Sequence, residues 1–255
     1  MVLLLFVNLD PDLAALRPLG GYFVLRTGGA AAGTLPTLAQ AYAATAPDVY
    51  GNPLIFRVGK VATALRAPES RVAASVAHLG LAARLWSVAL GCAALYGRVP
   101  DLDPRLLHWD ADAGAPDDLW LSEVRPLPGE AQTLGAVLAD VVLRAHLDPL
   151  SAALRAHHRL APGLLRGNAA SALAGAAREL DRWARRHGRT DTAVRARSLA
   201  AELLAHPLLT GAGTLTGTAF RRRSCCLYYR VPGGGLCGDC CFTRPPRSSP
   251  RAPSG

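Results

Sequence analysis

Apolar residues recur about every 3.6 positions through most of the first 210 residues, the spacing that places them on one face of a helix. Alanine and leucine, both strong helix formers, dominate these stretches. The pattern predicts helices over residues 36–46, 68–97, 132–147, 150–158, 164–187 and 191–206. Asp148-Pro149 predicts a break, because proline disfavours a helical conformation in the residue before it. Thr190 is expected to cap the last helix and Pro207 to end it.

Two short β-like segments, 106–111 and 118–124, flank a turn-rich Gly-Ala-Pro-Asp sequence. They predict a β-hairpin, and residues 21–27 predict a further strand. The expected fold class is therefore mainly α with a small β element (α+β). His108, Trp109 and Trp120 lie on the hairpin, and we expect them to pack in the core rather than to line a substrate pocket.

The run from residue 68 to residue 97 is apolar almost all round, so a membrane span is its main alternative interpretation. Arg71, Arg84 and Arg98 divide it into uncharged stretches of 12 and 13 residues. A span needs about 20 apolar residues, and a central arginine costs about 3 kcal/mol. We therefore expect a buried central helix and no transmembrane segment, with Trp86 and Ser87 packed inside it.

Five of the six cysteines lie between residues 225 and 241. Their order is an adjacent pair, Cys225 and Cys226, then ten residues, Cys237, two residues and Cys240. The opening residues show no basic stretch before the short apolar run and no cleavage site, so we expect a cytoplasmic protein, with the inner face of the membrane as a second location. That compartment disfavours disulfides.

Two kinds of inorganic centre remain for four such thiolates. A four-cysteine zinc site is usually built from two Cys-x2-Cys knuckles, and only Cys237-Gly-Asp-Cys240 forms one here. A two-iron, two-sulfide cluster takes two thiolates on each iron, which suits an adjacent pair and a knuckle. The spacing alone favours the 2Fe-2S cluster and leaves structural zinc open.

The terminal Cys-Cys-x10-Cys-x2-Cys motif resembles that of the ferric iron reductase FhuF-like family. The stretch RLWSVALGCAALYGRVPDLDPRLLHWD, the Gly-Asn step in LLRGNAASAL and the FRRRSCC lead-in resemble the single-domain members of that family. Cys241 departs from the pattern, because an apolar residue is expected there. The two-residue knuckle favours Cys240 over Cys241 as the fourth ligand.

The resemblance implies a 2Fe-2S protein that acts as a ferric-siderophore reductase, with Cys225, Cys226, Cys237 and Cys240 as the metal ligands. It implies one-electron reduction of Fe(III) to Fe(II) and an electron donor such as a ferredoxin or a flavin reductase. We expect a siderophore of the hydroxamate type, because its neutral or cationic ferric complex is easier to reduce than a catecholate complex. A non-enzymatic zinc- or cluster-binding protein and an iron–sulfur redox sensor are the alternatives. No catalytic acid or nucleophile beyond the cluster is required.

Two thirds of the net charge of +9 lies in residues 220–255, which hold seven arginines against Asp239 alone. Arg221, Arg222, Arg223 and Arg230 flank the cysteines, so we expect them to offset the negative charge of the cluster and tune its potential. We expect no nucleic-acid partner. The predicted division is a helical body (1–218), a cluster-binding segment (219–244) and a disordered tail (245–255).

Three further predictions concern single positions. His157-His158 is expected to be a solvated helix end rather than a metal site, because neighbours on a helix point about 100° apart. Asn168 is expected to cap a helix. Glycines 233–235 are expected to let the ten-residue loop fold around the centre, with backbone N–H groups of Gly238 and Asp239 donating to sulfur.

Overall fold

The computed structural model describes residues 13–28, 32–125, 127 and 133–246. Its helices are α2 (Leu38–Ala43), α3 (Pro53–Leu65), α4 (Ser70–Tyr96), α5 (Leu134–Leu138), α6 (Asp148–His157), α7 (Pro162–Arg186) and α8 (Thr190–Ala205), with a π-helical segment, η4 (Ala139–Leu147), between α5 and α6. The small β part comprises β1 (Arg26–Thr27), β2 (Leu107–Trp109), β3 (Leu119–Leu121), β4 (Gly213–Thr216) and β5 (Ala219–Arg222). The predicted class, mainly α with a small β element, is confirmed.

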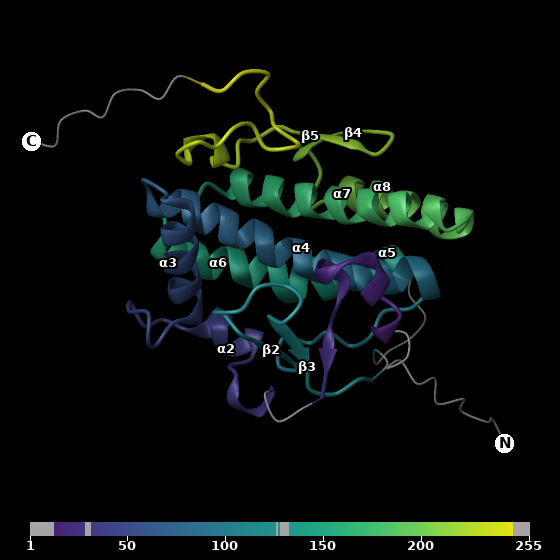
Figure 1. Ribbon diagram of the computed structural model, residues 1–255, viewed down its shortest axis with the longest axis horizontal. Coiled ribbons are helices and arrows are strands. Elements are labelled where there is room, and N and C mark those ends of the chain that lie inside the picture. Colours follow the sequence, from purple (N-terminus) through teal and green to yellow (C-terminus); the bar gives the residue numbers. More distant parts are fainter. Residues whose placement is uncertain (1–12, 29–31, 126, 128–132, 247–255) are drawn as a thin grey trace, which may run out of the picture.

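Helix α4 runs through the middle of the molecule, with α7 on one side and α6 on the other (Figure 1). It is long and apolar enough to cross a membrane, but 78% of its most apolar window is buried inside the protein. Trp86 is fully buried and Ser87 is 4% exposed. The prediction of a buried central helix is therefore confirmed.

The predicted break at Asp148-Pro149 is wrong. Helix α5, η4 and α6 follow one another without a gap, and Asp148 has helical φ and ψ of −66° and −53°. Pro149 stands in the first turn of α6, where the missing N–H of proline is tolerated. The π-helical hydrogen bonds of η4 widen the preceding turn, so the chain continues through the proline.

Two capping predictions are also wrong, and one helix was not predicted. Thr190 is the first residue of α8, and Arg189 occupies the cap position. Helix α3 follows a Gly-Asn-Pro sequence that is typical of a turn, yet the side chain of Asn52 caps it by accepting from the N–H groups of Leu54 and Ile55. Asn168, the second residue that was wrongly predicted to cap a helix, lies inside α7.

The β2–β3 hairpin is confirmed, and β1 joins β3 in parallel to complete a three-stranded sheet of order β1-β3-β2. The strand predicted over 21–27 is only two residues long, because Gly21–Phe23 forms a 3-10 turn, η2. Trp109 is buried as expected, whereas Trp120 is partly exposed beneath the guanidinium of Arg26.

A buried arginine ties the sheet region to α4. The side chain of Arg84 is 2% exposed, and its Nε donates to the carboxylate of Asp118 at 2.8 Å. Its remaining N–H groups donate to the backbone oxygens of Gly21, Tyr22 and Val24. This arginine, which interrupts the apolar run in the sequence, is therefore fully paired within the core.

The C-terminal part lies along α7 (Figure 1), and its 3-10 turn η5 (Tyr228–Arg230) also contacts α4. Strands β4 and β5 pair antiparallel, so the predicted boundary at 218/219 falls inside this hairpin. We call residues 219–244 the cysteine segment. Most of the predicted tail, 247–255, lies outside the described residues.

Candidate metal centre

The cysteine segment brings five thiols together. The Cys225 thiol lies within electrostatic reach of Cys226, Cys240 and Cys241, and that of Cys237 acts on Cys226 and Cys240. All six cysteines are among the described residues, and no disulfide joins any two of them. Cys92 is buried in α4, away from this group.

Each of four cysteines accepts a hydrogen bond from the backbone N–H two residues further along the chain. Leu227 N–H donates to Cys225 Sγ at 3.2 Å, and Phe242 N–H donates to Cys240 Sγ at 3.4 Å. The N–H groups of Tyr228 and Asp239 donate in the same way to Cys226 and Cys237. The donation predicted for Asp239 is thus present. Backbone N–H groups placed in this way stabilise negative charge on sulfur.

Two backbone features bend the chain into these turns. Leu227 has a φ of 68°, an unusual conformation for a leucine, directly after the cysteine pair. Gly233 also has a positive φ, 71°, which glycine adopts at no steric cost. A Cβ on Gly234 would lie 2.8 Å from the backbone oxygens of Tyr228 and Val231. The ten-residue loop therefore needs Gly233 and Gly234 for its shape.

The thiols are too crowded to ionise together. A hydrogen bond from the Cys237 thiol lowers the pKa of Cys226 to about 6 and raises that of Cys237 well above its usual range. Burial raises the pKa of Cys225 to about 11, and burial also raises that of Cys241. Four thiolates at this spacing would need a cationic centre, such as a bound metal, to offset their repulsion.

Arg222, at the end of β5, is the predicted tuning residue that acts on the thiols. It is 3% exposed, and its positive charge lowers the pKa of both Cys226 and Cys241. Its Nη1 group is buried without a hydrogen-bond partner among the described atoms. A buried guanidinium N–H with no acceptor is costly, so this atom is suited to an anionic group next to the cysteines.

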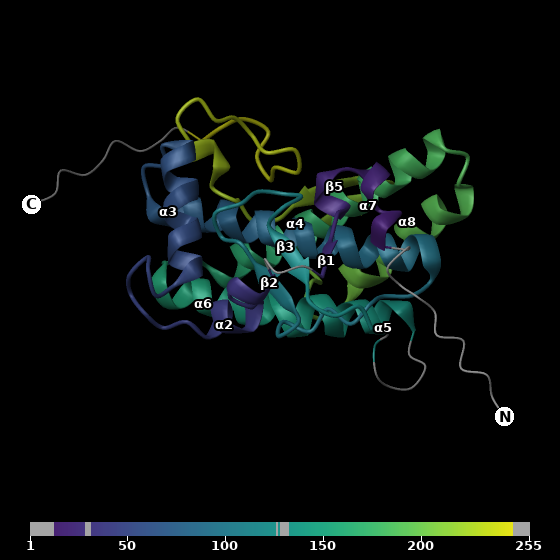
Figure 2. The ribbon, with the colours of Figure 1, turned by 60° about the horizontal axis from the view of Figure 1, so that its bottom comes forward.

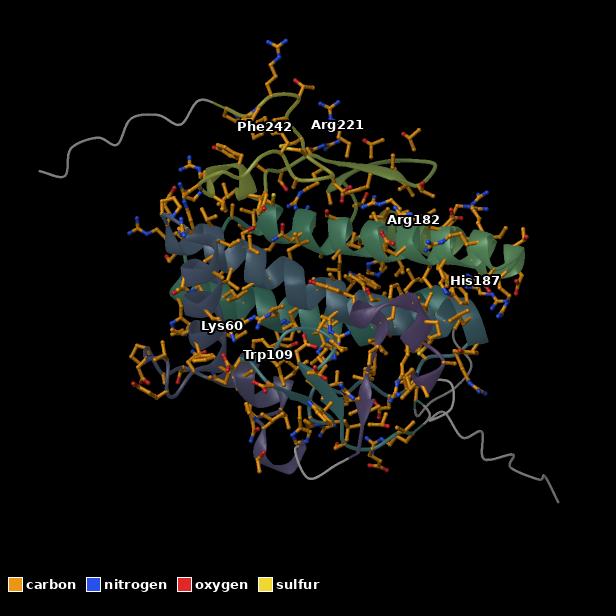
Figure 3. All side chains as sticks on the ribbon, in the orientation of Figure 1. Lys60, Trp109, Arg182, His187, Arg221 and Phe242 are labelled. Atoms are coloured by element: carbon orange, nitrogen blue, oxygen red, sulfur yellow. The ribbon has the colours of Figure 1, made fainter. Side chains whose placement is uncertain are left out.

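The other three arginines are placed differently. Arg221 lies on the outer side of the segment, near Phe242, and its Nη2 donates to the backbone oxygen of Cys241 at 3.2 Å (Figure 3). Arg223 is exposed. Arg230 forms an ion pair with Glu69 and lies over the ring of Tyr229. Glu69 therefore offsets part of the charge that Arg230 brings to the segment.

A buried polar network holds the cysteine segment on α4 and α7. Ser75 Oγ donates to the backbone oxygen of Cys226 at 2.8 Å, and Asn168 Nδ2 donates to Ser75 O at 2.9 Å. Arg222 Nη2 donates to Asn168 Oδ1 at 2.6 Å, which closes the chain of contacts. Asn168 is fully buried inside α7, so it positions Arg222 rather than capping a helix.

A second anchor holds the Cys237–Cys240 turn. The carboxylate of Asp239, which is 8% exposed, accepts from Ser171 Oγ at 2.5 Å and from Arg178 Nη1 at 3.3 Å. The backbone oxygen of Asp239 also accepts from the N–H of Arg222 at 2.9 Å. The sequence pattern did not indicate that Ser75, Ser171 and Arg178 help to hold the cysteine segment. The only sequence feature that could have suggested it is the position of such polar residues on the buried face of an Ala-rich helix.

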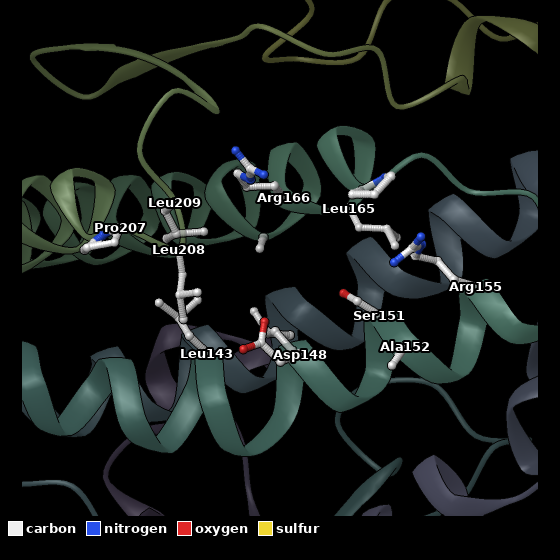
Figure 4. A pocket seen from close by; sticks show the side chains of 13 residues that line it. Leu143, Asp148, Ser151, Ala152, Arg155, Leu165, Arg166, Pro207, Leu208 and Leu209 are labelled. Carbon is white, nitrogen blue, oxygen red and sulfur yellow. The ribbon is translucent and has the colours of Figure 1, made fainter.

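The remaining candidates lie elsewhere. His157 ends α6 as predicted, but it and His158 are half-buried rather than solvated: His157 Nε2 lies 3.4 Å from Asn52 Nδ2, and His158 Nε2 is buried. Nδ1 of His108 lies 2.9 Å from the backbone oxygen of Leu35, a structural contact. A cavity of about 340 Å³ between η4, α6 and the start of α7 has Asp148 and Arg166 in its wall, but no residue of the cysteine segment (Figure 4). None of these positions belongs to the cysteine centre.

The donor set of the cysteine segment fits a 2Fe-2S cluster, in which each of the two irons takes two thiolates. Among the described residues, no group of three or more His, Cys, Asp or Glu side chains has the close spacing that one metal ion needs. What the segment offers is four soft thiol donors with an N–H group behind each, and a buried guanidinium atom without an acceptor. Thiolates backed by N–H donors are the ligand set of iron–sulfur clusters.

Comparison with known protein families agrees with an iron–sulfur site in the cysteine segment. Residues 222–242 match the family model described as the FhuF 2Fe-2S C-terminal domain. The expected resemblance to the FhuF-like family is thereby confirmed over this segment, and the cofactor is a 2Fe-2S cluster. No curated protein matches the chain.

Proposed function

We propose that this iron–sulfur protein of the FhuF type is a ferric-siderophore reductase, which transfers one electron to Fe(III) and releases the iron as Fe(II). The observation that carries the proposal is the FhuF 2Fe-2S match over residues 222–242, on a segment whose thiols gather at one place. Siderophores hold Fe(III) through hard oxygen donors, and Fe(II) is softer and more labile. When bound, the cluster supplies the single electron that this change requires.

We assign Cys225, Cys226, Cys237 and Cys240 as the cluster ligands. These are the four cysteines that accept an N–H from the residue two positions on. The Cys241 thiol instead accepts from its own backbone N–H and contacts the Cys240 thiol, so its backbone support differs from that of the other four. This difference supports Cys240 over Cys241.

The chain's own residues would stabilise the negative charge that reduction adds to the centre. The four N–H groups point at the sulfurs, and Arg222 places a buried positive charge beside them. The side chain of Arg222 is fixed by Asn168 and by the backbone oxygen of Ser224. Donors held in this way require no rearrangement when the electron arrives.

The proposed partners are a ferric siderophore of the hydroxamate type and an electron donor such as a ferredoxin or a flavin reductase, in the cytoplasm. Hydroxamate complexes of Fe(III) are neutral or weakly cationic and easier to reduce than the highly anionic catecholate complexes. This choice suits a centre whose charge is offset by one buried arginine.

Trapping of Fe(II) under anaerobic turnover tests the proposal. The purified protein, excess NADPH, a catalytic amount of ferredoxin with its NADPH-dependent reductase, and a ferric trihydroxamate are mixed with a ferrous-specific chromogenic chelator. We expect Fe(II) to form at a rate proportional to the protein concentration, and Cys226→Ser to abolish that dependence. A rate independent of the protein, measured with cluster-loaded material, would reject the reductase and favour a sensing or structural role for the cluster.

A further inference from the structure

A cleft of about 540 Å³ opens directly beside the proposed cluster ligand Cys237. Its walls are α4, α7 and the N-terminal 3-10 turns, and its end is formed by Cys237, Gly238 and Asp239. In Figure 2 the N-terminal segment, drawn in purple, and the yellow cysteine segment both lie next to α7. The volume falls within the range of about 300–1,000 Å³ that is typical of small-molecule sites.

We propose that this cleft is the binding site for the ferric siderophore, and that it selects neutral or singly cationic trihydroxamate complexes over trianionic catecholate complexes. The proposal rests on the proposed function for the identity of its ligand. The position, the shape and the charge of the cleft carry it.

Position is the first argument. Cys237 lines the cleft and also contacts Cys226 through its thiol, so a ligand in the cleft lies against the proposed cluster. Asp239 shares this wall and is held by Ser171 and Arg178, both from α7. The wall next to the cluster is therefore fixed by hydrogen bonds before any ligand binds, which lowers the cost of binding.

Shape is the second argument. Small residues from both helices form the sides of the cleft: Gly80 and Ala83 from α4, and Ala172, Gly175 and Ala176 from α7. Their spacing of three or four positions places them on one face of each helix. With two aliphatic side chains that α4 adds, these small residues form a largely apolar wall, which suits the aliphatic linkers of a trihydroxamate.

Charge is the third argument. Four charged residues line the cleft, Arg178 and Arg222 against Glu179 and Asp239, and their formal charges cancel. Arg178 is paired with Asp239 at 3.3 Å, so it is not available as a free cation. A complex of charge −3 would lose its hydration without gaining a net positive partner, whereas a neutral complex loses little.

Gly80→Leu is the variant that tests the cleft. A Cβ on Gly80 would meet no atom within 4 Å, so the leucine side chain has room to enter the cleft without displacing neighbours. Leucine is also the better helix former, so α4 is not weakened. Gly59→Leu is the matched control: Gly59 is an exposed glycine of α3, its Cβ also meets nothing within 4 Å, and it does not line the cleft.

Binding is measured by calorimetry with Ga(III) complexes, because gallium copies the size and charge of Fe(III) but is not reduced. We expect the Ga(III) complex of a linear trihydroxamate to bind the cluster-loaded protein, and Gly80→Leu to weaken its Kd at least tenfold. Gly59→Leu should leave the Kd unchanged, and a Ga(III) tris-catecholate should bind at least tenfold more weakly than the trihydroxamate. Equal affinity of the wild type and Gly80→Leu, or no binding to the wild type, would overturn the proposal.

Reduction assays separate this proposal from the proposed function. If the wild type and Gly80→Leu reduce a ferric trihydroxamate with the same KM, the reductase stands and the cleft is not its substrate site. If the gallium complex binds in the cleft but the ferric complex is not reduced by the wild type, the binding site stands and the reductase fails.

Discussion

At the scale of single residues, the structure separates the five clustered cysteines by their backbone neighbours. Cys225, Cys226, Cys237 and Cys240 each accept an N–H from two residues further on. Burial of the thiols and their mutual repulsion oppose deprotonation of the whole set unless a metal centre binds.

The first prediction concerns these ligands. Changing Cys225, Cys226, Cys237 or Cys240 to Ser, one at a time, is expected to remove the visible absorption of the cluster, because an iron loses a thiolate. Cys241→Ser should retain two irons and two sulfides per chain, and Cys92→Ser, a change in the core of α4, serves as the control. Loss of the cluster in Cys241→Ser with retention in Cys240→Ser would contradict the assignment.

The second prediction concerns Arg222. Arg222→Gln is expected to lower the reduction potential by tens of millivolts, since one charge at ~4 Å is worth about 1 kcal/mol in water, or about 40 mV for one electron. Arg222→Lys keeps the charge and should retain most of the potential, and the exposed Arg221→Gln should change it less. Equal potentials in Arg222→Gln and the wild type, measured by redox titration, would show that Arg222 has only a structural role.

The cysteines and their spacing were predictable because cluster ligands are local in sequence: all lie within 16 residues, 225–240. Ser75, Asn168 and Ser171 were not predictable, because their roles depend on contacts across 54 to 151 residues of chain. Asn168 shows the difficulty: a Gly-Asn step has the sequence of a helix cap, and only the packing of α7 against α4 shows that it is buried.

At the scale of elements, the cysteine segment depends on a close approach to α7. A Cβ on Gly167 would lie 2.3 Å from Ser224 Oγ and 2.9 Å from Arg222 Nη2. The hydrogen bonds of Ser224 to Gly163 O and of Arg222 to Leu164 O hold the two elements at this distance. The glycine is therefore required by the contact and not by its own backbone conformation.

The third prediction follows from this contact. Gly167→Ala is expected to displace the segment and lower the cluster content at least severalfold, while the far-UV circular dichroism of the helical body is retained. Gly175→Ala, in the same helix, is the control, because its Cβ would meet nothing closer than Arg178 Nη2 at 3.9 Å. A full cluster content in Gly167→Ala would show that the segment does not need this approach.

The helices with continuous apolar periodicity, such as α4 and α7, were predicted nearly to their ends. The π-helical segment η4 was not, because no simple sequence pattern distinguishes i→i+5 from i→i+4 hydrogen bonds, and Pro149 predicted a break instead. The β4–β5 hairpin was also missed: its strands are short and half exposed, so the alternation of apolar residues is weak.

At the scale of the whole molecule, stability depends on polar groups buried in the core. Arg84 and Asp118 join α4 to the sheet region and are almost fully buried.

As the fourth prediction, Asp118→Ala is expected to lower the free energy of unfolding by about 3–5 kcal/mol, because it leaves the buried charge of Arg84 unpaired. The exposed pair gives the control: Asp112→Ala, which removes the partner of Lys60, should cost about 1 kcal/mol or less. Equal losses in urea unfolding would contradict this assignment.

Two buried histidines predict a pH dependence. Burial lowers the pKa of His78 to about 3 and that of His146 to about 4, both below the ordinary value near 6.5. Below pH 6.5 the unfolded chain therefore binds protons that the folded chain does not, so stability falls as the pH drops. The fifth prediction is a loss approaching about 1.4 kcal/mol per pH unit for each histidine between pH 6 and 4.5. In urea unfolding of the apoprotein, His146→Gln should reduce this slope; an unchanged slope would reject the assignment.

Single-turnover mixing tests most directly whether this protein passes one electron from its cluster to siderophore-bound Fe(III). Protein reduced with dithionite and freed of excess reductant is mixed anaerobically with a ferric trihydroxamate, and cluster absorption and Fe(II) are followed together. The account predicts that the cluster reoxidises faster than in buffer alone and that one Fe(II) appears for each cluster oxidised. A cluster that stays reduced in the presence of the ferric complex, or reoxidises without Fe(II), would contradict it.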